Sequence, residues 1–220
     1  MAFDHQADRI NQTFWERTWA DVSAERVAAY AAALDASPDA IVGILRERGC
    51  KTICDAGCGC GAYALKLFRS GFSVSGFDVS ENAVQMTRRL LSESDYSPDG
   101  FKTADLLSPG FPDRRFDAVV ARDVIDHMPV ADAMCAVSEL FRLAKPGGCV
   151  LLTVDPTDDE YESEPHKINA DGDYCYCGGK WDGMVFHPYT PAEAARLTAA
   201  FPGRTVIADN GGFLIVLDKK

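Results

Sequence analysis

This 220-residue chain has few basic residues, no long apolar run and no internal repeat. It carries 22 Lys and Arg against 33 Asp and Glu, a formal net charge of −11. Because sequence-independent affinity for nucleic acid comes from Lys and Arg that neutralise phosphates, this balance argues against a nucleic-acid partner. The longest apolar stretches, at residues 27–34 and 149–154, are far shorter than the ~20 residues that cross a bilayer. We therefore expect no membrane partner.

The first nineteen residues are charged throughout and lack the apolar core of a signal peptide. We expect a cytosolic protein in which the eight cysteines are reduced thiols. Cys175 and Cys177 raise the question of a zinc site, which His166 and His187 would have to complete. A structural zinc site normally has four ligands, often in C-x₂₋₄-C pairs, so free thiols in a turn are favoured and no metal is predicted.

Short strands and helices alternate from residue 51 onward. Strands are predicted at residues 52–56, 72–78, 101–105, 116–122 and 149–155. Helices are predicted at residues 61–70, 80–93 and 131–144. Strands separated by helices of this length are typical of βαβ units and a parallel sheet.

Residues 1–49 are predicted to be a helical extension that precedes a domain over residues 50–220. One helix is expected over residues 3–34. Ser37 has the character of an N-cap and Pro38 of a first helical residue, which predicts a second helix through Arg48.

The C-terminal part adds a helix from Thr190-Pro191 to about residue 200 and two strands, at residues 204–208 and 213–217. Asp209-Asn210-Gly211-Gly212 between these strands favours a tight hairpin. We expect seven strands in one mostly parallel sheet, with one antiparallel strand near its end.

The segment Cys54-Asp55-Ala56-Gly57-Cys58-Gly59-Cys60-Gly61-Ala62 lies where the first predicted strand meets the first predicted helix. Open α/β sheets bind ligands in that crevice, and glycines there let the backbone approach the ligand. Gly57, Gly59 and Ala62 also match the dinucleotide pattern G-x-G-x-x-G/A, so an NAD site is an alternative.

Two carboxylates bear on the choice of cofactor. Asp55 ends the first strand, where it would repel a pyrophosphate but attract the ammonium and sulfonium groups of S-adenosylmethionine. Asp78 ends the second strand, about 20 residues after the glycines, where it can accept hydrogen bonds from both ribose hydroxyls of either cofactor. Asp55 therefore favours S-adenosylmethionine, and Asp78 does not decide.

Four segments, which follow one another in the order typical of the family, resemble the motifs of class I S-adenosylmethionine-dependent methyltransferases. The resemblance is to the branch of this family that acts on small molecules. The four segments are Asp55-Ala56-Gly57-Cys58-Gly59-Cys60-Gly61, Gly76-Phe77-Asp78-Val79-Ser80, the stretch from Phe116 to His127, and Leu143-Ala144-Lys145-Pro146-Gly147-Gly148. The resemblance covers about residues 50–155. It implies a Rossmann-like class I methyltransferase fold with helices on both faces of the sheet.

The resemblance also implies a role for each matched position. Asp55, Gly57, Cys58, Gly59 and Gly61 would surround the methionine portion of the cofactor. Asp78 would hold the ribose and Val79 would pack on the adenine, which Asp105 and Leu106 would also meet. Arg122 would follow the fourth strand near the sulfonium, where a cation is unfavourable unless it turns away or toward an acidic partner.

His127 follows the fourth strand on the side where the methyl acceptor would arrive. Its pKa near neutrality suits a general base for a hydroxyl or amine acceptor, and the alternative is a histidine that fixes the loop through a backbone hydrogen bond. Trp15 and Trp19 share one helix face, where they either pack the N-terminal helix onto the domain or cover the cofactor and acceptor.

Residues 156–187 form a long stretch with little periodicity. Between Asp155 and His187 nine acidic residues stand against two lysines, among several aromatic residues. Long loops of this kind are typical of active-site lids. We expect this segment to fold over the pocket and to place some of Tyr174, Tyr176, Trp181, His187 and Tyr189 on the acceptor side, with Trp181, His187 and Tyr189 as the candidate acceptor residues.

The sequence thus predicts an S-adenosylmethionine-dependent methyltransferase that moves a methyl group to a small-molecule O, N or S acceptor. Such a displacement needs aligned reactants in a dry pocket and few reactive side chains. An NAD-linked oxidoreductase and a non-catalytic S-adenosylmethionine-binding protein remain the alternatives.

Overall fold

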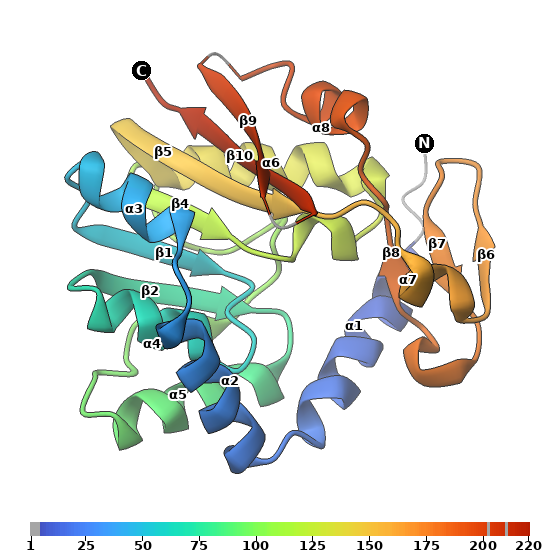
Figure 1. Ribbon diagram of the computed structural model, residues 1–220, viewed down its shortest axis with the longest axis horizontal. Helices are drawn as coiled ribbons and strands as arrows, with labels where there is room; N and C mark the ends of the chain where they lie inside the picture. The colour runs from blue at the N-terminus through green and yellow to red at the C-terminus, as the bar shows by residue number, and fades with distance from the viewer. Residues whose placement is uncertain (1–4, 202, 210) are drawn as a thin grey trace.

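The computed structural model describes residues 5–201, 203–209 and 211–220, which fold around a seven-stranded sheet (Figure 1). The strand order is β3-β2-β1-β4-β5-β10-β9, and β10 runs antiparallel to both of its neighbours. The strands are β1 (Thr52–Ala56), β2 (Ser73–Asp78), β3 (Phe101–Thr103), β4 (Phe116–Ala121), β5 (Ala144–Val154), β9 (Arg204–Asp209) and β10 (Gly212–Asp218). The predicted fold class, a mostly parallel sheet with one antiparallel strand, is confirmed.

Helices cover both faces of this sheet because successive strand residues point to opposite sides. In β1, Ile53 packs among the buried residues of one face and Cys54 among those of the other. The helices on the first face are α2 (Ala24–Ala36), α3 (Ala40–Glu47), α4 (Ala62–Arg69) and α5 (Glu81–Glu93). Those on the second face are α6 (Val130–Leu143) and α8 (Pro191–Leu197).

The N-terminal helices differ from the sequence prediction. The helix expected over residues 3–34 is two helices, because α1 (His5–Ala20) ends and Ser23 caps a new helix by accepting a hydrogen bond from the Arg26 backbone. Phe3 and Asp4 lie outside the described residues.

The cap of the next helix also differs. Ser37 ends α2, and its hydroxyl donates to the Ala33 carbonyl. Asp39 caps α3 instead, since its carboxylate accepts a hydrogen bond from the Val42 backbone. The division into a 1–49 extension and a 50–220 domain stays a prediction, but α2 and α3 share their buried cluster with α4.

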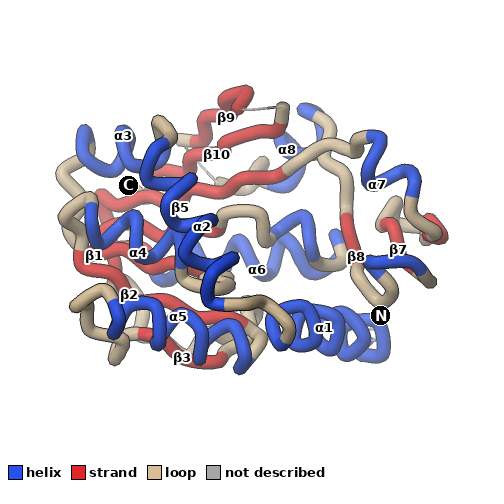
Figure 2. The backbone as a smooth tube through the Cα atoms, turned by 60° about the horizontal axis from the view of Figure 1, so that its bottom comes forward, coloured by secondary structure: helices blue, strands red, loops and turns tan. Residues whose placement is uncertain are grey.

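Residues 156–187 are not a structureless loop. They contain α7 (Asp159–Ser163), the 3₁₀ turn η2 (Gly179–Trp181) and a separate antiparallel sheet of β6 (His166–Ile168), β7 (Tyr174–Tyr176) and β8 (Val185–Phe186). We call this part the small lobe; Figure 2 shows it beside one end of α1. Its strands are too short for a period to show in the sequence, and Cys175 lies in β7 rather than in a turn.

An aromatic cluster joins the small lobe to α1. Its buried members are Phe14, Tyr174, Tyr176, Met184 and Phe186, and Trp15, Tyr161 and Trp181 pack against them. Two polar contacts strengthen this junction: Arg17 donates to the Asp182 carbonyl, and Asn11 accepts from the Val185 backbone.

In the part of the chain that the structure describes, no single helix is long and apolar enough to cross a membrane. The helices α2 and α3 meet that test only together, as a pair bent by 58°.

Candidate active site

A cavity of about 850 Å³, its open mouth included, lies at the carboxyl ends of the parallel strands. Its β2 side consists of residues that follow β1, β2 and β3: Gly57, Gly59, Phe77, Asp78, Val79, Ala104, Asp105, Leu106 and Leu107. Its β4 side consists of residues that follow β4 or begin α6: Asp123, Val124, His127, Met128, Pro129 and Asp132. One face of α1 contributes Asn11, Gln12, Trp15 and Trp19.

The glycine loop brings backbone close to this cavity. A Cβ at Gly59 would lie only 3.0 Å from the indole of Trp19. The absence of a Cβ therefore lets the indole approach the loop backbone closely. Gly61 adopts φ 80° at the start of α4, and a Cβ there would lie 2.8 Å from the Thr87 backbone. Gly61 and Cys58, whose thiol lies 3.6 Å from the Thr87 hydroxyl, shape the turn but do not line the cavity.

Asp78 is buried at the end of β2 and faces the cavity. Its two carboxylate oxygens accept hydrogen bonds of 2.9 Å, one from the Gly59 backbone and one from the Ser80 backbone. These contacts fix the carboxylate beside Val79, which also lines the cavity. Burial raises the pKa of Asp78 from its ordinary value, and the backbone hydrogen bonds oppose that shift.

Asp55, the penultimate residue of β1, is 2% exposed and is not among the residues that line the cavity. Its Oδ2 has no hydrogen-bond partner among the described residues. Burial and the neighbouring charge of Asp78 raise the pKa of Asp55 to about 7, although Arg122 opposes the shift. A buried carboxylate oxygen without a donor is unusual, and it fits a cofactor that brings a positively charged donor.

Asp105 and Leu106 line the cavity after β3. The Asp105 carboxylate accepts a 2.8 Å hydrogen bond from the Leu107 backbone and a 3.3 Å hydrogen bond from the Gln12 side chain. Arg122 is not a cavity residue: its guanidinium lies over the Tyr63 ring, and its Nε is 3.6 Å from Asp123 Oδ2. Arg122 thus turns toward an acidic partner, one of the two orientations considered from the sequence.

His127 lines the cavity, and its ring packs between aromatic residues. The ring centroid is 5.1 Å from that of Trp15 and 5.6 Å from that of Phe186, while Nδ1 is buried with no hydrogen-bond partner among the described residues. Its backbone carbonyl accepts a 2.8 Å hydrogen bond from Asn11. Burial lowers the pKa of His127 to about 4, so the imidazole is neutral at neutral pH.

Trp15 and Trp19 both line the cavity, whereas Trp181, His187 and Tyr189 do not. Trp181 packs in the aromatic cluster, His187 Nδ1 lies 2.9 Å from Asp173 Oδ1, and Tyr189 is 1% exposed within the core of the second sheet face. The predicted placement of these three residues on the acceptor side is therefore corrected. Trp181 and His187 belong to the small lobe, which packs on α1 through the aromatic cluster, whereas Tyr189 follows that lobe and lies in the core of the second sheet face.

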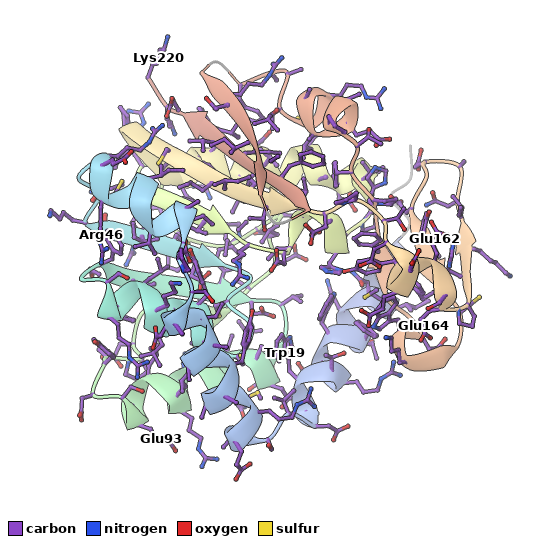
Figure 3. The ribbon with its side chains drawn as sticks, in the orientation of Figure 1. Trp19, Arg46, Glu93, Glu162, Glu164 and Lys220 are labelled. Atoms are coloured by element: carbon purple, nitrogen blue, oxygen red, sulfur yellow. The ribbon has the colours of Figure 1, made fainter. Side chains whose placement is uncertain are left out.

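Figure 3 shows this arrangement: Trp19 lies on the side of α1 toward the sheet, and Glu162 and Glu164 lie on the small lobe beyond α1. Asn11 and Gln12 also line the cavity, but they are not among the residues predicted from the sequence. The helical period offered a signal, because Asn11 precedes Trp15 by four residues and so shares its face. Asp123, Met128 and Asp132 gave no comparable signal.

No metal centre is found: in the described ranges no three or more His, Cys, Asp or Glu residues could hold an ion. Cys175 is half-buried and Cys177 exposed, and neither is in a disulfide. The fold and the cavity together define a protein that binds a nucleoside-bearing cofactor at the carboxyl edge of a parallel sheet.

Residues 53–148 match the family model described as "Methyltransferase domain". Over 116 residues the chain is 34% identical to ubiquinone biosynthesis O-methyltransferase from Nitrosomonas europaea, covering 52% of this chain and 47% of that relative. The chain thus spans about half the length of the curated relatives it matches. The central part of the chain is thus similar to methyltransferase domains.

Solved structures agree on the fold. An S-adenosylmethionine-dependent methyltransferase from Methanosarcina mazei is similar with a TM-score of 0.66 at 21% identity, over 83% of this chain and 98% of that one. Magnesium protoporphyrin IX methyltransferase from Synechocystis, solved with S-adenosylhomocysteine, is similar with a TM-score of 0.60 at 21% identity, over 96% of each chain. These matches favour S-adenosylmethionine over NAD as the cofactor.

Proposed function

We propose that this chain transfers a methyl group from S-adenosylmethionine to a small-molecule O, N or S acceptor. The observation that carries the proposal is one continuous cavity that joins Asp78 and Asp105 on its β2 side to His127 on its β4 side. The relatives named above include an enzyme of ubiquinone biosynthesis, which supports a small-molecule acceptor. The cysteines, expected from the sequence to be reduced thiols, favour a cytosolic location.

The cofactor, when bound, supplies an electrophilic methyl group on a sulfonium. On the β2 side, Asp78 would accept hydrogen bonds from the ribose hydroxyls, and Val79 and Leu106 would pack on the adenine near Asp105. Asp55 would receive the ammonium of the methionine portion. On the other side, Trp15 and Trp19 exclude water, so that alignment in a dry cavity lowers the barrier to transfer.

His127 is our candidate for the group that accepts the proton of the acceptor. It faces the cavity, and its ring is held by Trp15 and Phe186 rather than by a hydrogen bond to the loop. Its depressed pKa keeps the imidazole neutral well below neutral pH, and it also makes His127 a weaker base than an ordinary histidine.

Replacing Asp78 with alanine should weaken binding of S-adenosylhomocysteine by about 1–3 kcal/mol, since charged hydrogen bonds to the ribose are lost. Isothermal titration calorimetry measures this. The control is Asp99→Ala, at an exposed acidic residue that does not line the cavity, and it should leave the affinity unchanged. An unchanged affinity in Asp78→Ala would remove the ribose role from this residue.

At saturating S-adenosylmethionine, whose bound ammonium keeps Asp55 ionised, kcat should stay level from pH 8 down to about pH 5.5, because His127 with a pKa of about 4 remains neutral over that range. His127→Phe keeps the ring packing and should lower kcat by roughly 100-fold or more, the usual worth of a positioned base. Cofactor affinity should change less than about twofold. An acidic limb with an apparent pKa near the ordinary histidine value, or a wild-type rate in His127→Phe, would contradict the role as base. Cofactor binding without transfer to any acceptor would indicate a non-catalytic binding protein.

A further inference from the structure

Two neighbouring thiols, Cys50 and Cys149, lie away from the cavity, and the proposed function does not use them. Cys50 lies two residues before β1, at the amino ends of the parallel strands, whereas the cavity lies at their carboxyl ends. We propose that this pair is a modification site at which a small peroxide forms a reversible disulfide. Because neither cysteine lines the cavity, this inference is independent of the proposed methyl transfer.

Strand pairing and an ion pair bring the two cysteines together. In β5, Cys149 is paired with Asp218 of the antiparallel strand β10. The guanidinium of Arg48, two residues before Cys50, forms an ion pair with that same Asp218. Cys50 and Cys149 belong to one buried cluster, and their side chains share a hydrogen bond in which the Cys149 thiol donates. Both thiols are free, so they are available for an intramolecular bond.

The surroundings make Cys50 the more nucleophilic of the two thiols. The hydrogen bond from Cys149 lowers the pKa of Cys50, and the Arg48 charge acts in the same direction, although burial opposes both. The same hydrogen bond and burial raise the pKa of Cys149. Cys50 is 6% exposed and Cys149 is 0% exposed, so a small oxidant meets Cys50 first.

The oxidant is a peroxide, and the reaction has two steps. In the first, the Cys50 thiolate attacks one peroxide oxygen and the O–O bond breaks. Cys50 becomes a sulfenic acid, and the other oxygen leaves as hydroxide, which takes up the proton that the Cys50 thiol released. In the second step, the Cys149 sulfur attacks the Cys50 sulfur, the S–S bond forms and the S–O bond breaks. The departing hydroxide leaves as water with the Cys149 proton. Two thiols are oxidised, and one hydrogen peroxide is reduced to two waters.

The test exposes the full chain to equimolar hydrogen peroxide and then blocks the remaining thiols with an alkylating reagent. Mass spectrometry of a digest measures each cysteine and any linked peptides. We expect a link between Cys50 and Cys149. We also expect the Cys50 thiol to be consumed at least about threefold faster than the exposed thiol of Cys135, because the thiolate is the reactive species. Dithiothreitol should restore both thiols of the pair.

Two single variants separate the roles of the two thiols, and Cys135→Ser is the matched control. In Cys149→Ala the link cannot form, so Cys50 should accumulate as a sulfenic acid that dimedone traps. In Cys50→Ala the buried Cys149 should stay reduced, since an oxidant does not reach it directly. Cys135→Ser should form the link at the wild-type rate.

Three results would each overturn the inference. The first is a wild-type Cys50 that stays reduced while Cys135 is oxidised. The second is oxidation of Cys50 without a link to Cys149. The third is oxidation of Cys149 in Cys50→Ala as fast as in the wild type.

Discussion

Asparagine in place of Asp55 should stabilise the ligand-free protein at pH 8 and at the same time weaken cofactor binding by roughly 10- to 100-fold, the worth of one charged hydrogen bond. The first effect follows from the raised pKa. Because the folded protein holds the Asp55 proton up to a pKa of about 7, against 3.8 ordinarily, the stability contribution of this group is present at low pH. It is lost as the pH rises through 7, at a cost on the order of 4 kcal/mol.

The asparagine side chain does not ionise, so the variant avoids most of this loss. Because the buried amide has a cost of its own, we expect the unfolding free energy of the variant to exceed that of the wild type by about 1–3 kcal/mol at pH 8. Thermal unfolding at pH 5 and pH 8 measures the difference between variant and wild type, which should grow with pH. Calorimetry of S-adenosylhomocysteine measures the second effect. It should also detect proton release by the wild type at pH 6, because a bound ammonium favours the ionised carboxylate.

Asp117 provides a matched control with the opposite sign. Its carboxylate accepts hydrogen bonds from the Lys145 side chain and from the backbones of Lys51 and Thr52. Burial raises the pKa of Asp117, but these hydrogen bonds outweigh burial and lower the pKa to about 2. Its stabilising contribution is present above the ordinary pKa and is lost as the pH falls through 2. Asp117→Asn should therefore destabilise the protein at pH 8 and leave cofactor affinity unchanged. If Asp55→Asn instead lowers stability at pH 8, or binds cofactor as the wild type does, Asp55 does not face the ammonium.

The loss of Asp173 should cost about 3–5 kcal/mol of unfolding free energy, because it leaves the buried His187 without its partner. Asp173 is 1% exposed; its Oδ1 lies 2.9 Å from His187 Nδ1 and accepts a 3.1 Å hydrogen bond from the Val130 backbone. Asn169 donates to its other oxygen. These hydrogen bonds outweigh burial and hold the pKa of Asp173 below its ordinary value.

Through Val130, Asp173 also positions the loop that carries His127 and Met128. Asp173→Ala should therefore raise the KM for the acceptor while the cofactor affinity stays within about twofold, since the β2 side is untouched. Asp173→Asn keeps the shape and the one oxygen that faces His187 and Val130, but it places an NH2 group opposite the Asn169 amide, so it should recover part of the stability and the KM. Chemical denaturation and steady-state kinetics separate the two effects. Equal loss of cofactor and acceptor binding would show a general loosening of the fold rather than positioning.

The sequence predicted the region from β1 to α5 closely, since each boundary there has a local cause. Gly61 starts α4 in a left-handed conformation, and Ser80 caps α5 by accepting a hydrogen bond from the Ala83 backbone. The glycine loop and Asp78 follow from the same local chemistry, and so the β2 side of the cavity was predictable. What local pattern could not supply is the orientation of the Arg122 side chain.

The small lobe was not predictable, because contacts between distant residues determine it. Its strands pair over three residues or fewer. Its aromatic residues, expected over the cavity, pack against Phe14 of α1 and against one another instead. Tyr189 was misplaced for a related reason. Its backbone donates to the Asp155 carbonyl, and its ring lies in the second sheet face, a position set by chain pairing rather than by residue type.

We infer that S-adenosylmethionine binds in the cavity against Asp78 and directs its ammonium toward Asp55, which is not itself a lining residue. Calorimetric titration of the whole chain with S-adenosylhomocysteine and, separately, with NAD is the decisive measurement. We expect one site of micromolar affinity for S-adenosylhomocysteine, weakened in Asp78→Ala and Asp55→Asn, and no measurable binding of NAD. Binding of NAD, or S-adenosylhomocysteine binding that neither substitution affects, would overturn the inference.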